Sequence, residues 1–175
     1  MGVPPTPRWR PTARLLVLDP LGRLLLFRFR DAEGHIVWLT PGGGLQPGET
    51  VQAAAVRELA EETGYLIGEA ELGPVVATRA GLWRSGSGRL VFAADTYFQV
   101  RVAHPQVSLA GHEEHERSLI TGHRWWTLAE LLEPDEDVSP PGAADLVAAL
   151  TANGPPAQPI RLPWRTPLSS SPPMG

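Results

Sequence analysis

The sequence contains no cysteine and no lysine, so all 15 of its basic Lys+Arg positions are arginines. The absence of cysteine excludes disulfides, thiolate metal sites and cysteine nucleophiles. It also means that cysteine usage does not indicate whether the protein works in an oxidising or a reducing compartment. The absence of lysine excludes a phosphate-loop lysine and Schiff-base chemistry. No apolar run has the length of a membrane span, and the N-terminus has no apolar core like that of a signal peptide. A cytoplasmic protein without a membrane partner is therefore expected.

The net charge of −4 and the pI near 5.7 provide no broad basic surface, which argues against bulk nucleic-acid binding. A length of 175 residues suits one domain with a sizeable core. Composition divides the chain into a proline-rich arm at 1–12, a domain at 13–154 and a Pro/Ser-rich tail at 155–175. The tail is predicted to be disordered, with Trp164 as an anchor to the core.

Apolar runs and turn residues predict a mixed sheet with helices on its faces, which is an α/β fold. Two hairpins are expected, one at Asp19–Gly22 and one at Ser85–Gly88. Polar loops are expected at 103–118 and 134–141. The predicted strands are 13–18, 23–30, 36–39, 72–84, 90–102 and 124–127, and the predicted helices are 51–63, 128–132 and 143–152.

The predicted helix at 51–63 carries Glu58, Glu61 and Glu62 at i, i+3 and i+4, within roughly one-third of its circumference. Thr50 suits its N-cap and Gly64 suits the left-handed residue at its end. We expect the apolar stripe to pack inward and the acidic face to remain exposed to water. Like charges on one patch repel, and a bound divalent cation would reverse that penalty.

The segment before this helix, 41–48, is rich in glycine, so its backbone can approach a ligand closely and offer a carbonyl oxygen. Carboxylate oxygens are hard ligands that suit Mg²⁺ or Mn²⁺, and Mg²⁺ usually shares its coordination sphere with substrate phosphates. Arg57 precedes Glu61 by four residues and can hold a carboxylate by a forked hydrogen bond, and Glu49 can reach the same face. The residues indicate metal-assisted attack on a phosphate ester or anhydride.

This stretch resembles the Nudix box, the motif of hydrolases that act on nucleoside diphosphates linked to another group. All its fixed residues occur at the family spacing, with Tyr65 where the family generally has an aliphatic residue. The resemblance extends to Trp38–Gly43 before the box and to 124–131 after it, and it implies a Nudix α/β/α sandwich. The motif in this chain reads Gly43-x5-Glu49-x7-Arg57-Glu58-Leu59-x-Glu61-Glu62-x-Gly64-Tyr65.

The resemblance implies that Glu58, Glu61 and Glu62 bind the metal, together with the carbonyl of Gly42 or Gly43. It gives Arg57 and Glu49 an orienting role. Family members differ in the general base, which is either the residue equivalent to Glu58 or a glutamate of a later loop. In this chain that loop offers Glu113, Glu114 and Glu116, and Glu116 is preferred because it is nearest to the following strand. Family members are often dimers, so a homodimer is one arrangement that the resemblance implies.

The box does not identify the substrate, and no downstream marker of a family subgroup is recognisable. One of Trp125 and Trp126 is expected in the core and the other at the surface or in a pocket, where it could stack on a base. Trp83 and Arg84 are further substrate-binding candidates. The HEEHE run at 112–116 also reads as a charged surface loop, and the zinc reading of His112, His115 and His123 matches no standard spacing.

Other enzyme classes fail on specific residues. The allylic diphosphate isomerase that shares the Nudix fold uses a cysteine, a serine hydrolase elbow requires G-x-S-x-G, and the dinucleotide fingerprint has Pro47 where its last glycine would fall. We therefore expect a Mg²⁺-dependent pyrophosphohydrolase with a small nucleotide-like substrate, either a nucleoside diphosphate derivative or a (d)NTP. The alternative is a catalytically silent nucleotide-sensing or partner-binding module on the same scaffold.

Overall fold

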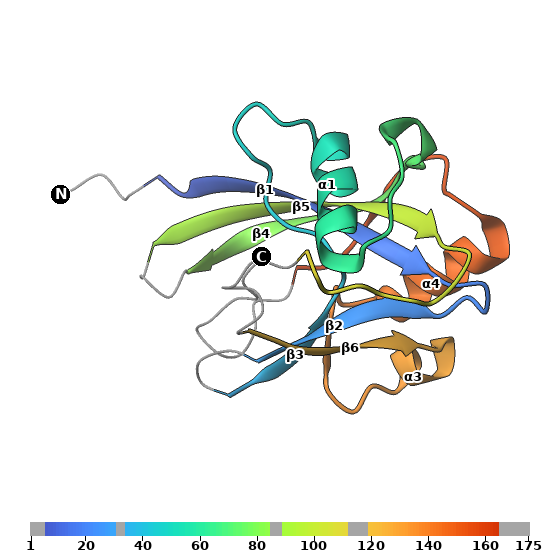
Figure 1. Ribbon diagram of the computed structural model, residues 1–175. Coiled ribbons are helices and arrows are strands. Elements are labelled where there is room, and N and C mark those ends of the chain that lie inside the picture. The colour runs from blue at the N-terminus through green and yellow to red at the C-terminus, as the bar shows by residue number, and fades with distance from the viewer. Residues whose placement is uncertain (1–5, 31–33, 85–88, 112–118, 165–175) are drawn as a thin grey trace.

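The computed structural model describes residues 6–30, 34–84, 89–111 and 119–164. These residues form a mixed sheet with helices on both faces, which is an α/β/α sandwich (Figure 1). None of the helices in these ranges is long and apolar enough to cross a membrane. The elements are β1 (Arg8–Leu18), β2 (Leu24–Arg30), β3 (Ile36–Leu39), α1 (Val51–Thr63), the 3-10 turn η1 (Glu69–Glu71), β4 (Val75–Arg84), β5 (Leu90–Arg101), β6 (Ile120–Trp126), α3 (Leu128–Leu132), β7 (Asp137–Ser139), α4 (Ala143–Asn153) and β8 (Ile160–Arg161).

The sheet has the strand order β7-β3-β2-β1-β5-β4-β8, with β6 also paired to β2. Strands β1 and β5 are parallel along the whole of β1, whereas β4–β5, β2–β3 and β2–β6 are antiparallel. The predicted hairpins β1–β2 and β4–β5 are both confirmed. In the first hairpin the register contains only the pair Leu18↔Leu24, so most of this edge of β1 is not paired with β2.

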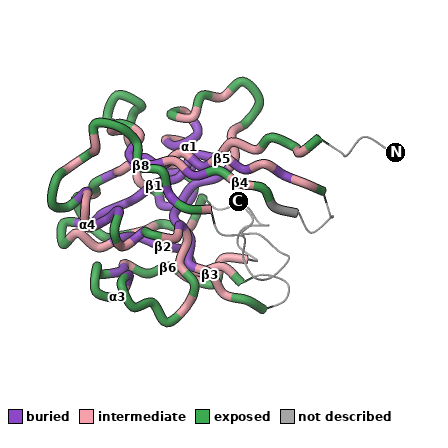
Figure 2. Tube along the Cα trace, turned by 180° about the vertical axis from the view of Figure 1, so that it is seen from behind, coloured by how far each residue is buried: buried purple, intermediate pink, exposed green. Residues whose placement is uncertain are grey.

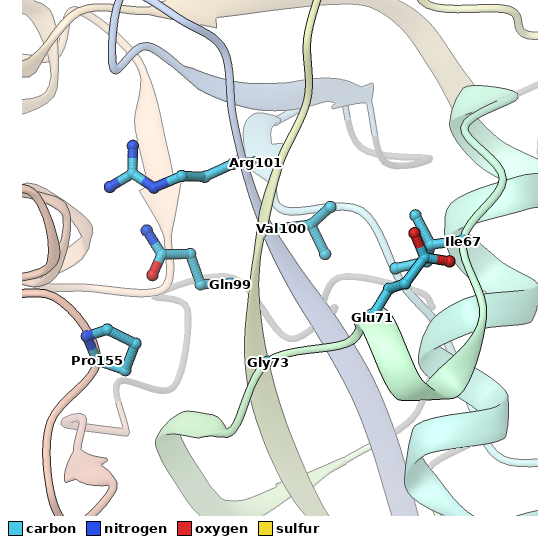
Figure 3. A pocket seen from close by; sticks show the side chains of 7 residues that line it. All are labelled: Ile67, Glu71, Gly73, Gln99, Val100, Arg101 and Pro155. Carbon is cyan, nitrogen blue, oxygen red and sulfur yellow. The ribbon is translucent and has the colours of Figure 1, made fainter.

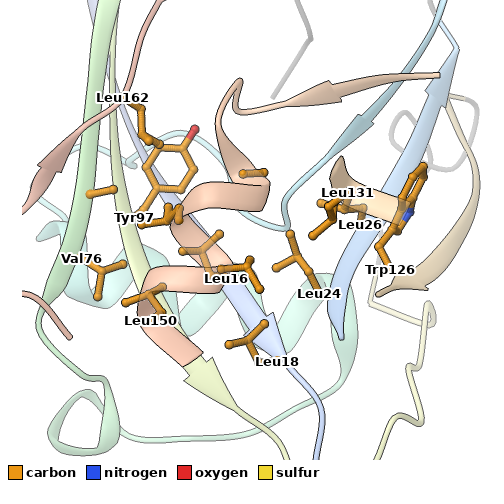
Figure 4. Close-up of a cluster of buried hydrophobic side chains, with 14 of the residues drawn as sticks. Leu16, Leu18, Leu24, Leu26, Val76, Tyr97, Trp126, Leu131, Leu150 and Leu162 are labelled. Carbon is orange, nitrogen blue, oxygen red and sulfur yellow. The ribbon is translucent and has the colours of Figure 1, made fainter. Parts of the chain in front are cut away.

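Strand β1 separates two hydrophobic cores because its side chains alternate between the faces of the sheet. Leu15 and Val17 pack with Ala55 and Leu59 of α1, whereas Leu16 lies in the cluster that α4 covers. Figure 4 shows this second cluster, and Figure 2 shows the buried residues concentrated along the central strands. The two cores fix α1 and α4 on opposite faces of the sheet.

Local residues determine α1, whose predicted bounds are confirmed. The Thr50 hydroxyl accepts a hydrogen bond from the Ala53 N–H at 3.1 Å and caps the first turn. Gly64 ends the helix in the left-handed region at φ 77° and donates its N–H to the Ala60 carbonyl.

Strands β1, β4, β6 and β7 differ from the sequence prediction within the first 154 residues, and β4 begins at Val75 rather than at Leu72. Strand β1 begins at Arg8, so half of the expected arm is part of the sheet, where it pairs with β5. Strand β6 begins at Ile120 rather than Arg124 because its earlier residues also pair with β2. Strand β7 lies in the expected loop and pairs in parallel with β3. Next to β7, Glu136 accepts hydrogen bonds from Arg28 Nη2 at 2.6 Å and from Trp38 Nε1 at 2.6 Å, which ties this segment to β2 and β3.

The prediction of a disordered tail is wrong for its described part, 155–164. Strand β8 pairs in parallel with β4, and Leu162 is buried. Trp164 packs on Gly81, where an added Cβ would lie 2.1 Å from the indole ring, and the Arg79 guanidinium lies 5.0 Å from the centre of that ring. Trp164 therefore anchors the segment, as predicted.

Candidate active site

The glycine-rich loop runs beside β1, along the edge that β2 leaves unpaired. The N–H of Leu15 donates to the carbonyl of Pro41 at 2.9 Å, and the N–H of Ala13 donates to the carbonyl of Gly43 at 3.0 Å. Further along, the N–H of Leu45 donates to the carbonyl of Pro11 at 3.3 Å. These bonds fix the loop between the sheet and α1, in front of the acidic helix face.

Gly42 has no room for a side chain. Its φ is 123°, and an added Cβ would lie 2.1 Å from the backbone carbonyl oxygen of Ala13. Its peptide groups are held on both sides, because the N–H donates to Glu62 Oε2 at 2.5 Å and the carbonyl accepts from Arg14 Nη1 at 2.6 Å. Buried Arg14 thus pins the loop from the sheet side while Glu62 pins it from the helix.

Gly43 is in contact with the acidic cluster itself. An added Cβ there would lie 2.5 Å from Glu58 Oε1, so the carboxylate occupies the space that a side chain would take. Both loop carbonyls proposed as metal ligands already accept one hydrogen bond, Gly42 from the Arg14 cation and Gly43 from the neutral Ala13 N–H. Because a guanidinium cation repels a metal ion, Gly43 is the better of the two candidate ligands.

Arg57 organises the acidic face of α1. It donates Nε and Nη2 to the two oxygens of Glu49 at 2.8 and 3.0 Å, and Nη2 also donates to the Gly44 carbonyl at 3.1 Å. Its Nη1 donates to Glu58 Oε1 at 2.8 Å and to Glu61 Oε2 at 2.9 Å. One planar cation therefore joins the loop, the helix entrance and two of the candidate metal ligands.

The prediction that the acidic face of α1 remains exposed is wrong for two of its three glutamates. Glu58 and Glu62 are 6% and 4% exposed, because the loop lies over them, whereas the Glu61 side chain is 46% exposed. Burial raises the pKa of Glu58, although the hydrogen bond from Arg57 opposes this shift. The hydrogen bond from Arg57 lowers the pKa of Glu49 below its usual range.

The described residues include no group of three or more His, Cys, Asp or Glu side chains already arranged around a metal position. The glutamates converge on Arg57 instead. Since Glu58 and Glu61 share one guanidinium nitrogen and Glu61 is exposed, a small rotation of Glu61 would bring the two carboxylates closer together. The oxygen-only donor set has the chemistry that Mg²⁺ and Mn²⁺ prefer.

The predicted substrate-binding residues do not lie together. Trp126 is 1% exposed in the core on the α4 side, so the structure removes the basis for stacking it on a base. Trp125 is half-buried on the α1 side of the sheet, and its Nε1 donates to the Pro105 carbonyl at 3.0 Å. Trp83 and Arg84 occupy the end of β4, opposite Val91 and Leu90 of β5, and their side chains lie outside the described residues.

Glu116, the candidate loop base, falls in 112–118, outside the described residues, as do Glu113, Glu114, His112 and His115. The third histidine of the zinc reading, His123, lies on β6, edge-on to the Phe27 ring at 6.2 Å between ring centres. The assignment of the general base to Glu58 or Glu116 therefore stays a prediction.

Sequence reasoning missed a charged cluster on the other face of β1. Asp95, 4% exposed, accepts from Arg79 Nε at 2.8 Å, from Arg79 Nη2 at 2.6 Å and from the Thr12 hydroxyl at 2.6 Å. Burial opposes ionisation of Asp95, but Arg14, Arg79 and Thr12 outweigh it and lower its pKa. The signal was available, since Arg79 and Asp95 are opposite charges at facing positions of the predicted β4–β5 hairpin.

A surface pocket of about 330 Å³ lies elsewhere, between η1 and the end of β5 (Figure 3). Its lining includes Glu71, Gln99 and Arg101. Gln99 and Arg101 are in register with Leu16 and Leu18 of β1, whereas the glycine loop is bonded to positions 11–15. None of the residues that line the pocket belongs to the acidic cluster.

A family model described as the NUDIX domain matches residues 8–148. Over 69 residues the chain is 36% identical to the RNA pyrophosphohydrolase of Novosphingobium aromaticivorans, a match that covers 39% of this chain and 41% of that protein. A putative 8-oxo-dGTP diphosphatase of Bacillus subtilis is 43% identical over 53 residues, or 30% of this chain and 34% of that protein. The chain thus spans about two fifths or less of the length of these curated relatives.

The fold also matches solved structures. The crystal structure of the MutT protein from Methanosarcina mazei Go1 superposes with a TM-score of 0.59 at 20% identity, covering 83% of this chain and 95% of that chain. At this identity the likeness concerns the fold alone. It agrees with the predicted α/β/α sandwich around a mixed sheet.

Proposed function

Because the chain belongs to the Nudix family, whose domain model covers residues 8–148, we propose that it is a divalent-metal-dependent pyrophosphohydrolase. It would cleave a diphosphate linkage in a nucleoside diphosphate derivative or a (d)NTP. The observation that carries this proposal is the arrangement around Arg57. That arginine holds Glu49, Glu58 and Glu61 against a glycine loop whose amide and carbonyl groups are fixed in direction.

Glu58, Glu61, Glu62 and the Gly43 carbonyl would hold the ion, which is Mg²⁺ in our proposal and Mn²⁺ in a substituted form. Bound there, a divalent ion would neutralise charge on phosphate oxygens and lower the pKa of water. The protein side of the site needs little reorganisation, because Glu58 and Glu62 are already buried in fixed positions. Only Glu61 is exposed enough to change rotamer freely.

Other residues of the chain would orient the carboxylates, hold the loop and accept a proton. Arg57 and Glu49 keep the carboxylates in position, and Arg14 keeps the loop in position. A general base must accept a proton from water near the glutamates, a role we assign to Glu58 or to Glu116.

The identity of the group attached to the diphosphate is a separate question. The two relatives named above are, by name, an RNA pyrophosphohydrolase and an 8-oxo-dGTP diphosphatase, so their substrates differ. Each match covers less than half of this chain and less than half of the relative. We propose a small nucleotide-like molecule as the partner, with Trp125, Trp83 and Arg84 as candidate contacts.

The test is product release from a panel of nucleoside triphosphates and nucleoside diphosphate derivatives, measured with Mg²⁺, with Mn²⁺ and with a chelator. Glu62→Gln keeps an oxygen for the Gly42 N–H but removes the charge, so we expect turnover to fall by about 100-fold or more with the fold intact. Glu71→Gln, a change at an exposed carboxylate outside the site, is the matched control and should leave the rate unchanged.

Two results would overturn the proposal. Nucleotide binding without turnover across the panel would favour the silent sensing module instead. An unchanged rate in Glu62→Gln would mean that the metal site lies elsewhere.

A further inference from the structure

Arg10 is a half-buried arginine on β1, and no carboxylate of the described residues contacts its guanidinium. Its guanidinium makes no hydrogen bond or ion pair with any residue in the described part of the chain. The other arginines of this region differ from it, since Arg14 bonds two loop carbonyls, Arg57 bonds three carboxylates and Arg79 bonds Asp95. A partly desolvated guanidinium with unused donors is a position where an anion gains strong hydrogen bonds.

The position of Arg10 relates it directly to the glycine loop. Arg10, Thr12 and Arg14 point to the same face of β1, since side chains alternate along a strand. An added Cβ on Gly44 would lie 4.0 Å from Arg10 Nε, whereas one on the neighbouring Gly43 would touch the Glu58 carboxylate. Gly44 therefore neighbours Arg10, and Gly43 neighbours Glu58. Since Gly43 and Gly44 are consecutive, Arg10 Nε and Glu58 Oε1 lie at most about 12 Å apart.

The charged groups around Arg10 leave its guanidinium available to bind an anion. Asp95 is the acidic group that attracts it, but the hydrogen bonds of Asp95 come from Arg79, Thr12 and Tyr97. Burial, Arg14 and Arg8 together lower the pKa of Arg10, so keeping its guanidinium charged costs free energy. An anion bound beside it would remove that cost. The Gly42–Gly44 loop therefore has carboxylates on one side and an unmatched positive charge on the other.

We propose that Arg10 binds a substrate phosphate beyond the diphosphate linkage that is cleaved at the glutamates. The substrate then carries a linear chain of three or more phosphates, as a nucleoside triphosphate does, rather than a diphosphate with a sugar on its far side. In a linear chain the third phosphate extends away from the carboxylates, across the loop toward Arg10. This inference rests on the proposed function and specifies its substrate class.

The decisive variant is Arg10→Gln, which removes the charge and keeps most of the side-chain volume. Because charge-assisted hydrogen bonds are lost, kcat/KM for ATP should fall by about 10–100-fold, whereas kcat/KM for ADP-ribose should change less than about twofold. Arg10→Lys should restore part of the ATP rate, because it retains a point charge without the fork. Arg101→Gln, at an exposed arginine at the end of β5, is the control and should change neither rate.

A second measurement does not depend on turnover or on metal. Tripolyphosphate binding to wild type and to Arg10→Gln is compared by calorimetry in the presence of EDTA, with urea unfolding as the check that the variant is folded. We expect the affinity for tripolyphosphate to fall by about 10-fold or more in the variant.

Equal affinities, or equal losses of kcat/KM on ATP and ADP-ribose, would refute the role of Arg10. If the wild type hydrolysed no substrate, the proposed function would fail, and the calorimetric comparison would still decide whether Arg10 binds phosphate.

Discussion

Two neighbouring glycines of the loop allow the candidate site to be tested separately from the fold. An alanine at position 42 would collide with backbone, because its Cβ would lie 2.1 Å from the Ala13 carbonyl oxygen and 2.9 Å from Arg14 Cα. An alanine at position 43 would collide only with the end of a side chain, the Glu58 carboxylate at 2.5 Å. Backbone in a sheet cannot yield, whereas a carboxylate can rotate away.

The two free energies of unfolding should therefore differ. For Gly42→Ala, a φ of 123° is strained by about 1–3 kcal/mol in a residue with a side chain. Detaching the loop also breaks its three backbone hydrogen bonds to β1, at roughly 1 kcal/mol each, so we expect a total loss of about 4–6 kcal/mol. For Gly43→Ala, the new rotamer of Glu58 costs about 0.5–1.5 kcal/mol, and a smaller unfolded-state entropy returns about 0.4–1 kcal/mol. The net change should stay below about 2 kcal/mol, including a weakened bond to Arg57.

Among folded molecules, Gly43→Ala should reduce activity more than Gly42→Ala does. Moving the Glu58 carboxylate disturbs a proposed metal ligand, and such changes typically weaken metal affinity by about 10–100-fold. Urea unfolding followed by the fluorescence of the 6 tryptophans measures stability, and Mn²⁺ binding by electron paramagnetic resonance measures the site. The reasoning is refuted if the two variants lose equal stability, or if Gly43→Ala binds Mn²⁺ as wild type does.

Three further changes test other parts of the structure. Arg57→Lys replaces a fork that bonds five oxygens on four residues with a point charge, so turnover should fall by about 10–100-fold with little loss of stability, and an unchanged rate would contradict the orienting role. Asp95→Asn leaves Arg79 buried without its counter-ion and should lower the unfolding free energy by about 3 kcal/mol near pH 7, as measured in urea. Because the pKa of Asp95 is below its ordinary 3.8 in the folded protein, its contribution is present above pH 3.8 and disappears as the pH falls through the folded value, so the two proteins should converge in acid. Trp164→Ala should cost about 2 kcal/mol by removing the indole from Gly81 and Arg79, and a loss under roughly 0.5 kcal/mol would mean that β8 holds the tail without it.

The parts of the fold that the sequence predicts well are those that neighbouring residues determine. Helix α1 has its predicted bounds because Thr50 caps one end and Gly64 ends the other. The two hairpins form because turn residues separate apolar runs by short distances. The same local logic places Arg57 within reach of Glu61, since residues four apart lie on one side of a helix.

The errors come from contacts between distant segments. Strands β7 and β8 are short, and they form only because β3 and β4 offer free edges to them. The first half of β1 looks like an arm because Pro11 interrupts the apolar pattern, yet β5 pairs with all of it. Short pairings of this kind have no periodicity that one segment could reveal.

The candidate site shows the same difference between what neighbouring residues determine and what distant segments determine. Spacing identifies which glutamates share a face, but their burial depends on a loop that β1 holds in place. Arg10 and Arg14 are separated in the sequence from the box by the whole of β2 and β3, so their contact with the loop could not be seen before the sheet was known.

The burial of the acidic face changes what a metal ion has to do there. Carboxylates repelling one another on an exposed helix would need the ion to bring them together, but here Arg57 already offsets the repulsion between Glu58 and Glu61. Glu62 likewise accepts a hydrogen bond from the Gly42 N–H. Removing an unpaired buried charge from water would cost several kcal/mol, so these partners are what allow the cluster to lie under the loop. The fold therefore holds Glu58 and Glu62 in place through Arg57 and the glycine loop, and an ion bound at the proposed site would reorganise the exposed Glu61 more than these two buried glutamates.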